Sequence, residues 1–298
     1  MNYIHLFFSS FSLLVYQTSG CTGDYEMSIS VGINGFGRIG RSTFSHIAES
    51  ARNDIHVTKI NATGPIETNA HLLKYDSVHG RFSGEITVEN DHLDIGNGPV
   101  KVFSSYDPND LDWSGCDVVL ECTGKFNDGL KSKVHIQQGA KSVLISAPAD
   151  NVDKTIVYGV NHRSLTDKDK IVSNGSCTTN CLAPLVKVVH ESIGIQHGQI
   201  TTIHDPTNTN VMVDAPHKDL RRARSAMTSL MPTTTGSAKA IGLIYPELKG
   251  KLNGHAVRAP VLNSSLTDAV FELARPTSTK EVNALFAEAA NNELAGIL

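Results

Sequence analysis

The chain has 298 residues, of which 40% are hydrophobic and 19% charged, and its formal net charge is −4. This composition is typical of a globular protein that forms one large domain or two ordinary ones. The slightly acidic balance leaves no extended basic face, which argues against a nucleic-acid partner.

The first 26 residues differ from the rest of the chain. An apolar run from Ile4 to Tyr16 has the length of a signal-peptide core, but no Lys or Arg precedes it. The run is too short to span a membrane, so no membrane partner is expected. We favour residues 1–26 as an extension or a mis-assigned start ahead of Met27, and a signal peptide is the alternative.

The cysteines indicate a reducing compartment, so we expect a cytoplasmic protein. The chain has five of them, an odd number, and they lack the paired short spacings of a disulfide framework. Cys177 and Cys181 have a zinc-like spacing, but no second ligand pair lies at a matching distance. No metal site is therefore predicted.

A glycine-rich turn follows the first clear strand. The strand Val31–Asn34 runs into Gly35-Phe36-Gly37-Arg38-Ile39-Gly40, and a helix is predicted over Arg41–Ser50. This is the G-x-G-x-x-G pattern in the strand–turn–helix setting of a dinucleotide site. The three glycines allow, in order, a tight turn, the approach of a pyrophosphate to the backbone and the packing of the helix on the strand.

The following strands extend the nucleotide-binding half. The second, Ile55–Ile60, leads into Ala62 and Thr63, where an acidic residue that binds the ribose 2′-hydroxyl is expected. Without that carboxylate a 2′-phosphate is not repelled, so the cofactor is NAD or NADP. Two further apolar strands end at Thr123-Gly124 and at Ser146, where open α/β sheets bind ligands.

A cysteine at the start of a helix is the centre of the second half. The strand Ile171–Val172 leads into Ser173–Cys181, and an amphipathic helix follows. Because proline is tolerated in the first turn of a helix, Pro184 predicts a helix start within a few residues of Cys177. The positive end of the helix dipole would lower the pKa of that thiol. A buried structural cysteine beside an N-cap is the alternative interpretation.

Later segments supply a base and anion-binding groups. The strand Gln199–His204 ends in a histidine, and if it runs parallel to the strand before Cys177, both residues lie at one sheet edge. A structural histidine is the alternative. The Arg-rich stretch Asp219–Arg224, the turn Pro232–Gly236 and Arg258 carry groups that a phosphorylated substrate needs, or else form a solvated face and a loop.

From Met27 onwards the chain resembles the phosphorylating glyceraldehyde-3-phosphate dehydrogenase family. The resemblance rests on long motifs in the family's order, VGINGFGRIGR (31–41), HLLKYDSVHGR (71–81), SNGSCTTNCLAP (173–184), DAPHKDLRRAR (214–224) and PELKGKLNG (246–254). It implies an α/β protein with a Rossmann-type parallel-sheet NAD(P)-binding domain over residues 27–176. An α+β mixed-sheet catalytic domain would follow over 177–298, and the subunits would form a homotetramer.

The resemblance also implies roles for individual residues. Cys177 would be the nucleophile and His204 its base. The cofactor would lie against the 35–40 turn and Ala62, Thr63, Thr123, Gly124 and Ser146. The implied phosphate-binding residues are Ser176, Thr178, Thr207, Arg222, Thr235, Gly236 and Arg258.

The segment His204–Asn210 departs from the usual family sequence and resembles the branch found in arsenic-resistance operons. That branch is paired with an arsenical efflux permease and uses arsenate to form 1-arseno-3-phosphoglycerate. A second departure is that the chain ends at Leu298, where family members continue, which indicates a C-terminally truncated chain.

The implied reaction starts from glyceraldehyde 3-phosphate. The Cys177 thiolate adds to the aldehyde, hydride leaves for the nicotinamide, and phosphate or arsenate releases the acyl group from the resulting thioester. The products would be 1,3-bisphosphoglycerate or 1-arseno-3-phosphoglycerate. A reductase of another acyl phosphate and an inactive cofactor-binding or oligomerisation module are the alternatives.

Overall fold

The computed structural model describes residues 28–50 and 52–298. The expectations for residues 1–26 lie outside this part. The chain forms two compact units. One consists of described residues 28–156 together with Ser164–Gly175, and the other consists of Val157–Arg163 with Ser176–Leu298. Within the described residues, no helix is long and apolar enough to cross a bilayer.

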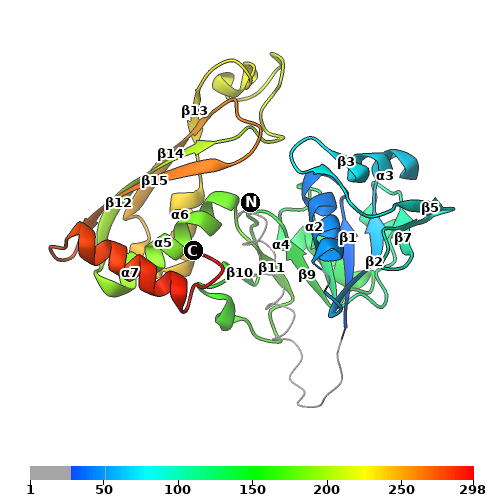
Figure 1. Ribbon diagram of the computed structural model, residues 1–298, viewed down its shortest axis with the longest axis horizontal. Coiled ribbons are helices and arrows are strands. Elements are labelled where there is room, and N and C mark those ends of the chain that lie inside the picture. Colours follow the sequence, from blue (N-terminus) through cyan, green and yellow to red (C-terminus); the bar gives the residue numbers. More distant parts are fainter. Residues whose placement is uncertain (1–27, 51) are drawn as a thin grey trace. The chain divides into compact units, whose positions relative to one another are not determined.

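The first unit is built on a nine-stranded sheet with the order β10-β11-β9-β8-β1-β2-β7-β6-β5 (Figure 1). The central strands β7-β2-β1-β8-β9-β11 run parallel in the 3-2-1-4-5-6 order of a Rossmann fold. The elements of the sheet and its covering helices are β1 (Ile29–Asn34), α2 (Arg38–Glu49), β2 (Ile55–Asn61), α3 (Ile66–Lys74), β5 (Thr87–Glu89), β6 (His92–Asp94), β7 (Val100–Phe103), β8 (Val118–Glu121), α4 (Gly129–Gln137), β9 (Ser142–Ile145), β10 (Lys154–Thr155) and β11 (Ile171–Ser173). A separate two-stranded ribbon pairs β3 (Tyr75–Asp76) with β4 (Gly80–Arg81).

The centre of this sheet is apolar on both faces, as a parallel sheet covered on both sides requires. Val31 and Ile33 on β1 and Val119 on β8 are fully buried. Helix α2 covers the sheet with Phe44 and Ile47, both buried. The helix begins at Arg38, three residues before the predicted start, because Gly37 is extended and serves as its N-cap.

The second unit contains a four-stranded mixed sheet with the order β13-β14-β12-β15. Strand β12 runs parallel to β14 and antiparallel to β15. The elements of this unit are α5 (Cys177–Ser192), β12 (Ile195–His204), β13 (Met231–Thr234), α6 (Ser237–Ile244), β14 (Leu252–Arg258), β15 (Ser265–Leu273) and α7 (Thr279–Asn291). Short 3-10 helices also occur. η1 (Pro108–Asp110) lies in the first unit, η3 (Leu220–Ala223) and η4 (Pro246–Leu248) lie in the second, and η2 (His162–Ser164) spans a boundary between the two. The predicted fold class, a Rossmann-type sheet followed by an α+β mixed sheet, is confirmed.

One face of the mixed sheet packs on helices α5 and α6, and its other face is exposed (Figure 1). Leu182 and Val186 of α5 and Ile241 of α6 are buried against Ile200 of β12. On the opposite face, Leu266 and Val270 of β15 are 63% and 64% exposed.

Two premises of the sequence analysis are wrong. Helix α5 does begin at Cys177, but Pro184 lies two turns inside it rather than in the first turn. The surrounding α5 residues Leu182, Ala183 and Val186 are fully buried, so tertiary packing holds the helix together where proline supplies no N–H. In addition, β11 and β12 belong to different sheets, so a shared sheet edge does not bring Cys177 and His204 together.

Candidate active site

The start of α5 is fixed by side-chain hydroxyl groups. Ser176 is the N-cap, and its Oγ accepts a hydrogen bond from the Thr179 backbone N–H at 3.0 Å. The same Oγ lies 2.9 Å from the Ser237 hydroxyl at the start of α6. The N-termini of α5 and α6 are therefore joined directly. The positive ends of their helix dipoles favour negative charge in this region.

The Cys177 thiol and the His204 imidazole meet across two elements. Cys177 Sγ, on the first residue of α5, lies 3.1 Å from His204 Nε2 at the end of β12. The cysteine residue is exposed to solvent, whereas His204 is 5% exposed. A reactant can thus reach the thiol while the histidine stays fixed.

The electrostatic surroundings favour a thiolate beside an imidazolium. Surrounding protein atoms partly desolvate the thiolate, which alone would raise the pKa of Cys177, but His204 and the Thr178 N–H and hydroxyl lower it below its usual value. Burial would lower the pKa of His204, but hydrogen bonds to Asp205 and Cys177 raise it to about 9, against the opposing charge of Arg258. The two groups titrate as a pair.

Other cysteines have the opposite environment. Burial, together with the Glu121 charge, raises the pKa of Cys122 to about 12 despite a hydrogen bond with Ser146. Burial also raises the pKa of Cys116. These two thiols stay protonated near neutral pH, so they are poor nucleophiles.

Hydroxyl and backbone groups surround the start of α5. Thr235 Oγ1 donates to Ser237 Oγ at 3.1 Å and accepts from the Ser237 backbone N–H at 3.2 Å. Gly236 is the N-cap of α6, and an added Cβ there would meet open space. Ser176, Thr178, Thr235 and Gly236 therefore lie in one region, at the joined N-termini of α5 and α6.

Among the three arginines of the Arg-rich stretch, only Arg222 has no carboxylate partner within the described residues. Arg221 pairs with Asp219, and Arg224 pairs with Asp214. Arg222 Nε instead donates to Thr233 Oγ1 at 2.7 Å, and its Nη1 lies 3.5 Å from Thr209 Oγ1.

Arg222, Thr207 and Arg258 are treated as a second group of candidate anion donors, in addition to the group at the N-termini of α5 and α6. Thr207 Oγ1 lies 3.1 Å from Thr209 Oγ1, which links it to Arg222. Arg258 Nη1 donates to the Asp205 carbonyl oxygen at 2.6 Å. Arg258 Nε is buried and has no hydrogen-bond partner among the described residues. A guanidinium with a spare buried donor is suited to bind an anion.

The glycine turn in the first unit fits a dinucleotide pyrophosphate. Gly35 has φ +97°, and an added Cβ would lie 2.7 Å from the Thr123 backbone nitrogen. A Cβ on Gly40 would lie 2.2 Å from the Gly35 carbonyl oxygen, whereas one on Gly37 would meet open space. Gly37 caps α2 without a side-chain hydrogen bond, so no cap side chain competes with an anion at this helix N-terminus.

A buried carboxylate holds the strand ends beneath this turn. Glu121 and His135 are both 0% exposed. Glu121 Oε2 accepts from Asn34 Nδ2 at 2.6 Å and lies 3.0 Å from His135 Nε2. Glu121 Oε1 accepts from the Thr123 backbone N–H at 2.8 Å and from the Thr123 hydroxyl. Four donors thus satisfy one carboxylate.

The other expected cofactor residues lie at the carboxyl ends of the same strands. Ala62 is buried after β2, and Thr63 beside it is exposed. Gly124 has φ +69° after β8, and the Ser146 N–H donates to the Glu121 carbonyl oxygen at 3.0 Å. In the turn itself, Phe36 is buried against Phe44, Arg38 pairs with Asp76, and Ile39 is 43% exposed.

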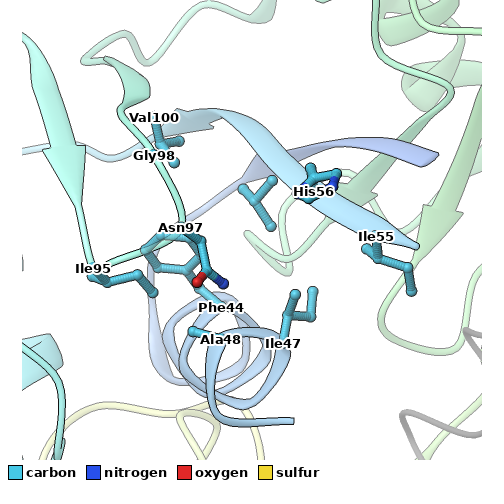
Figure 2. Close-up of a pocket in the computed structure, with 10 residues that line it drawn as sticks. Phe44, Ile47, Ala48, Ile55, His56, Ile95, Asn97, Gly98 and Val100 are labelled. Carbon is cyan, nitrogen blue, oxygen red and sulfur yellow. The ribbon is translucent and has the colours of Figure 1, made fainter. Parts of the chain in front are cut away.

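A separate hollow in the first unit offers no catalytic groups. Figure 2 shows it between α2, β2 and the segment before β7, with Phe44, Ile47 and Ile55 among its lining. His56 is the one ionisable side chain in its lining. Elsewhere in the described part of the chain, no group of three or more His, Cys, Asp or Glu side chains is arranged to hold a metal ion.

Comparison with known proteins decides the family. Residues 29–129 match the NAD-binding domain of glyceraldehyde 3-phosphate dehydrogenase, and residues 176–298 match its C-terminal domain. Over 272 residues the chain is 54% identical to a glyceraldehyde-3-phosphate dehydrogenase of Cereibacter sphaeroides, which covers 91% of this chain and 82% of that protein. The enzymes of the same name from Xanthobacter flavus and Geobacillus stearothermophilus are 52% and 50% identical, with the same coverage.

The chain belongs to the glyceraldehyde-3-phosphate dehydrogenase family. Membership confirms the family resemblance found in the sequence, and the matched NAD-binding domain confirms the expectation of NAD or NADP as cofactor. The glycine turn described above lies within that domain.

Sequence reasoning missed several partners of the site residues in this family member. Asp205, noted only as part of the segment that departs from the usual family sequence, contacts the His204 ring through its carboxylate. Ser237, which binds Ser176, was not singled out, and Thr233, which binds Arg222, was noted only as part of the turn 232–236. The acidic residue directly after His204 was the one available signal, because a carboxylate next to a histidine can bind its ring.

Proposed function

We propose that this protein oxidises D-glyceraldehyde 3-phosphate with NAD or NADP and transfers the acyl group to phosphate or arsenate through a thioester at Cys177. The observation that carries the proposal is the 3.1 Å contact between Cys177 Sγ and His204 Nε2 at the start of α5. We further propose that residues 27–176 act as the cofactor domain and 177–298 as the catalytic domain.

In this mechanism the Cys177 thiolate attacks the aldehyde carbon. His204, as the imidazolium, gives a hydrogen bond and then a proton to the developing alkoxide, which yields a thiohemiacetal. His204 takes the hydroxyl proton back as the carbon is oxidised, and a thioester remains on Cys177. When bound, the nicotinamide supplies the hydride acceptor for that oxidation.

The two groups of anion donors would hold the two negative groups of the reaction. Ser176, Thr178, Thr235 and Gly236 provide hydroxyl and N–H donors at joined helix N-termini. Thr207, Arg222 and Arg258 provide the second group, and the unpaired buried Nε of Arg258 supports its role as an anion donor. Which group binds the substrate phosphate and which the attacking oxyanion would follow from the KM values of variants in each.

Two substitutions test this proposal. Cys177→Ser should abolish aldehyde oxidation while cofactor affinity stays within a few-fold. His204→Asn should lose about 10²–10⁴-fold in rate, the usual contribution of a positioned base. Cys181→Ser, one turn further along α5, is the matched control and should retain activity. Unchanged turnover in Cys177→Ser would disprove the assignment.

The same assay separates the alternatives. A protein that reduces another acyl phosphate would turn over aspartyl or acetylglutamyl phosphate faster than the triose product. An inactive cofactor-binding module would bind NAD but show no difference between Cys177 and Cys181 in thiol reactivity.

We propose a homotetramer located in the cytoplasm. The exposed face of the mixed sheet, with Ile203, Leu266 and Val270, supports assembly, since an apolar sheet face of this kind is commonly covered by another subunit. An activated thiol also suits a reducing compartment. Light scattering should give four subunits, and Leu266→Asp should reduce that number.

Arsenate use in an arsenic-export pathway is the second proposal, favoured by the His204–Asn210 segment. Phosphate and arsenate share charge and tetrahedral shape, so arsenate turnover alone would not separate it from glycolysis. The gene should be expressed in an arsenic-sensitive host with and without an arsenical efflux permease. Resistance that needs both proteins supports the proposal, whereas rescue of glycolytic growth in a dehydrogenase-deficient strain without resistance contradicts it.

A further inference from the structure

We propose that the carboxylate of Asp205 is a positioning residue that holds the His204 ring with a proton on Nδ1 and so sets the charge state of the Cys177–His204 pair. The inference rests on the proposed function, because it concerns the same thiol and imidazole. It adds to the Cys177–His204 pair a carboxylate from the residue directly after the histidine.

The geometry places the carboxylate directly on the ring. His204 Nδ1 lies 2.7 Å from Asp205 Oδ1 and 2.8 Å from the Asp205 carbonyl oxygen. On the opposite side of the ring, Nε2 lies 3.1 Å from Cys177 Sγ. Both ring nitrogens are thus in contact with acceptors when the thiol is ionised, which is the arrangement that stabilises an imidazolium.

The carboxylate is itself held in place. Ser265 Oγ, at the start of β15, donates to Asp205 Oδ1 at 3.2 Å. Arg258 Nη1, at the end of β14, donates to the Asp205 carbonyl oxygen at 2.6 Å. Strands β14 and β15 flank β12 on its two sides, so one residue from each neighbouring strand fixes Asp205.

A second group competes for the same ring nitrogen. Arg258 Nη1 lies 2.6 Å from His204 Nδ1. Since a guanidinium only donates, it can bond Nδ1 only when that nitrogen carries no proton. Asp205 favours the protonated ring and Arg258 the unprotonated one. The groups that contact the His204 ring are therefore Cys177 from α5, Asp205 from its own strand end and Arg258 from β14, and Ser265 from β15 contacts Asp205.

The balance between these groups decides when the thiolate forms. The pKa of His204, raised to about 9, indicates that the two anionic partners outweigh both burial and Arg258. Without the Asp205 charge, the ring would bind its proton less tightly, and more of the pair would exist as neutral thiol and neutral imidazole. The thiolate would then form only at higher pH.

The test is the pH dependence of Cys177 alkylation by iodoacetamide, followed by mass spectrometry from pH 4 to 10. In the wild-type chain the rate should rise at a pH well below the ordinary thiol pKa of about 8.5. In Asp205→Asn this rise should move up by about 1–2 pH units, the size expected when a charged hydrogen bond is lost. Asp205→Ala removes the same charge with a smaller side chain and should move the rise in the same direction.

The control is a second histidine–carboxylate pair on the same strand. His197 Nε2 lies 3.0 Å from Glu272 Oε2 on the exposed part of β12 and β15. Glu272→Gln should leave the Cys177 profile unchanged. Melting temperatures of all variants are compared, so that a shifted profile is read only from folded protein.

The outcomes separate this inference from the proposed function. If His204→Asn moves the profile but neither Asp205 variant does, the role of Asp205 is disproved and the Cys177–His204 pair stands. If the wild-type rise already lies near pH 8.5 and His204→Asn leaves it there, the pair itself is disproved.

Discussion

Replacing Glu121 with Gln should destabilise the cofactor unit strongly although the two side chains have nearly the same shape. The reason is the set of donors around the carboxylate. Trp113 Nε1 can only donate, and it lies 3.1 Å from His135 Nδ1. His135 Nδ1 must therefore accept, which leaves the ring proton on Nε2 to be donated to Glu121 Oε2 at 3.0 Å. Every group that contacts the Glu121 side chain is then a donor.

A glutamine offers one acceptor oxygen and one NH2 donor. With its NH2 toward Asn34 and His135 a glutamine faces two donors; turned the other way it faces the Thr123 N–H, because the Thr123 hydroxyl can rotate to accept. At least one donor therefore loses its acceptor at a site that is 0% exposed. A hydrogen bond to a charged group contributes about 1.5–3 kcal/mol, so the free energy of unfolding should fall by at least that amount. With a urea m-value of about 2 kcal/mol/M, the midpoint should fall by about 0.75–1.5 M or more.

The chain contains a suitable reporter for this measurement. Trp113 is its single tryptophan, fully buried and bonded to His135, so its fluorescence follows the unfolding of this unit. Glu272→Gln is again the control, because its histidine pair is exposed and contributes about 0–1 kcal/mol. Protein concentration is held constant, since assembly also affects the midpoint. A Glu121→Gln midpoint no lower than that of the control would refute the reasoning.

Three further predictions follow from the geometry. Near pH 7, iodoacetamide should modify Cys177 at least about 10²-fold faster than Cys122, whose pKa is raised to about 12, and equal labelling by mass spectrometry would contradict this. Because Ala62 supplies no carboxylate for the ribose, kcat/KM should favour NAD over NADP by less than about 10³-fold. Ala62→Asp should increase this preference for NAD. A preference above about 10³-fold in the wild type would mean that another group rejects NADP. Gly40→Ala should lower the melting temperature, because its Cβ would lie 2.2 Å from a carbonyl oxygen of the turn. Gly37→Ala meets open space, so it should keep the melting temperature and should weaken NAD binding in calorimetry. Equal melting temperatures for the two variants would contradict this prediction.

Much of the cofactor unit could be predicted because its signals are local. The turn from Gly35 to Gly40 depends on backbone conformations and close contacts that only glycine allows, so the glycine spacing alone predicts it. The apolar runs around Val119 and Val143 likewise follow from burial on both faces of a parallel sheet. Glu121 stood at the end of one such run, but its four donors come from three separate segments, so its role could not be read from its own position.

The second unit was harder to predict because its contacts join residues that are far apart in the sequence. The predicted start of α5 near Cys177 is correct, but the argument for it from Pro184 was wrong, because packing tolerates a proline inside this helix. The sheet that carries His204 is a different one from that of β11, since the order of strands is set by contacts between residues far apart in sequence. The hydrogen bond between Ser176 and Ser237 spans 61 positions and has no local sequence signature.

The chain is synthesised from its N-terminus, and this order has a consequence for the site on the mixed sheet. Cys177 and His204 are only 27 positions apart, but Arg258 and Ser265 follow their partners His204 and Asp205 by 54 and 60 positions. Closing such long loops comes late in folding, because their entropy is lost before distant contacts form. During synthesis the thiol therefore emerges well before the strands that complete its surroundings, and Cys177 behaves as an ordinary, weakly ionised thiol until β14 and β15 have paired with β12.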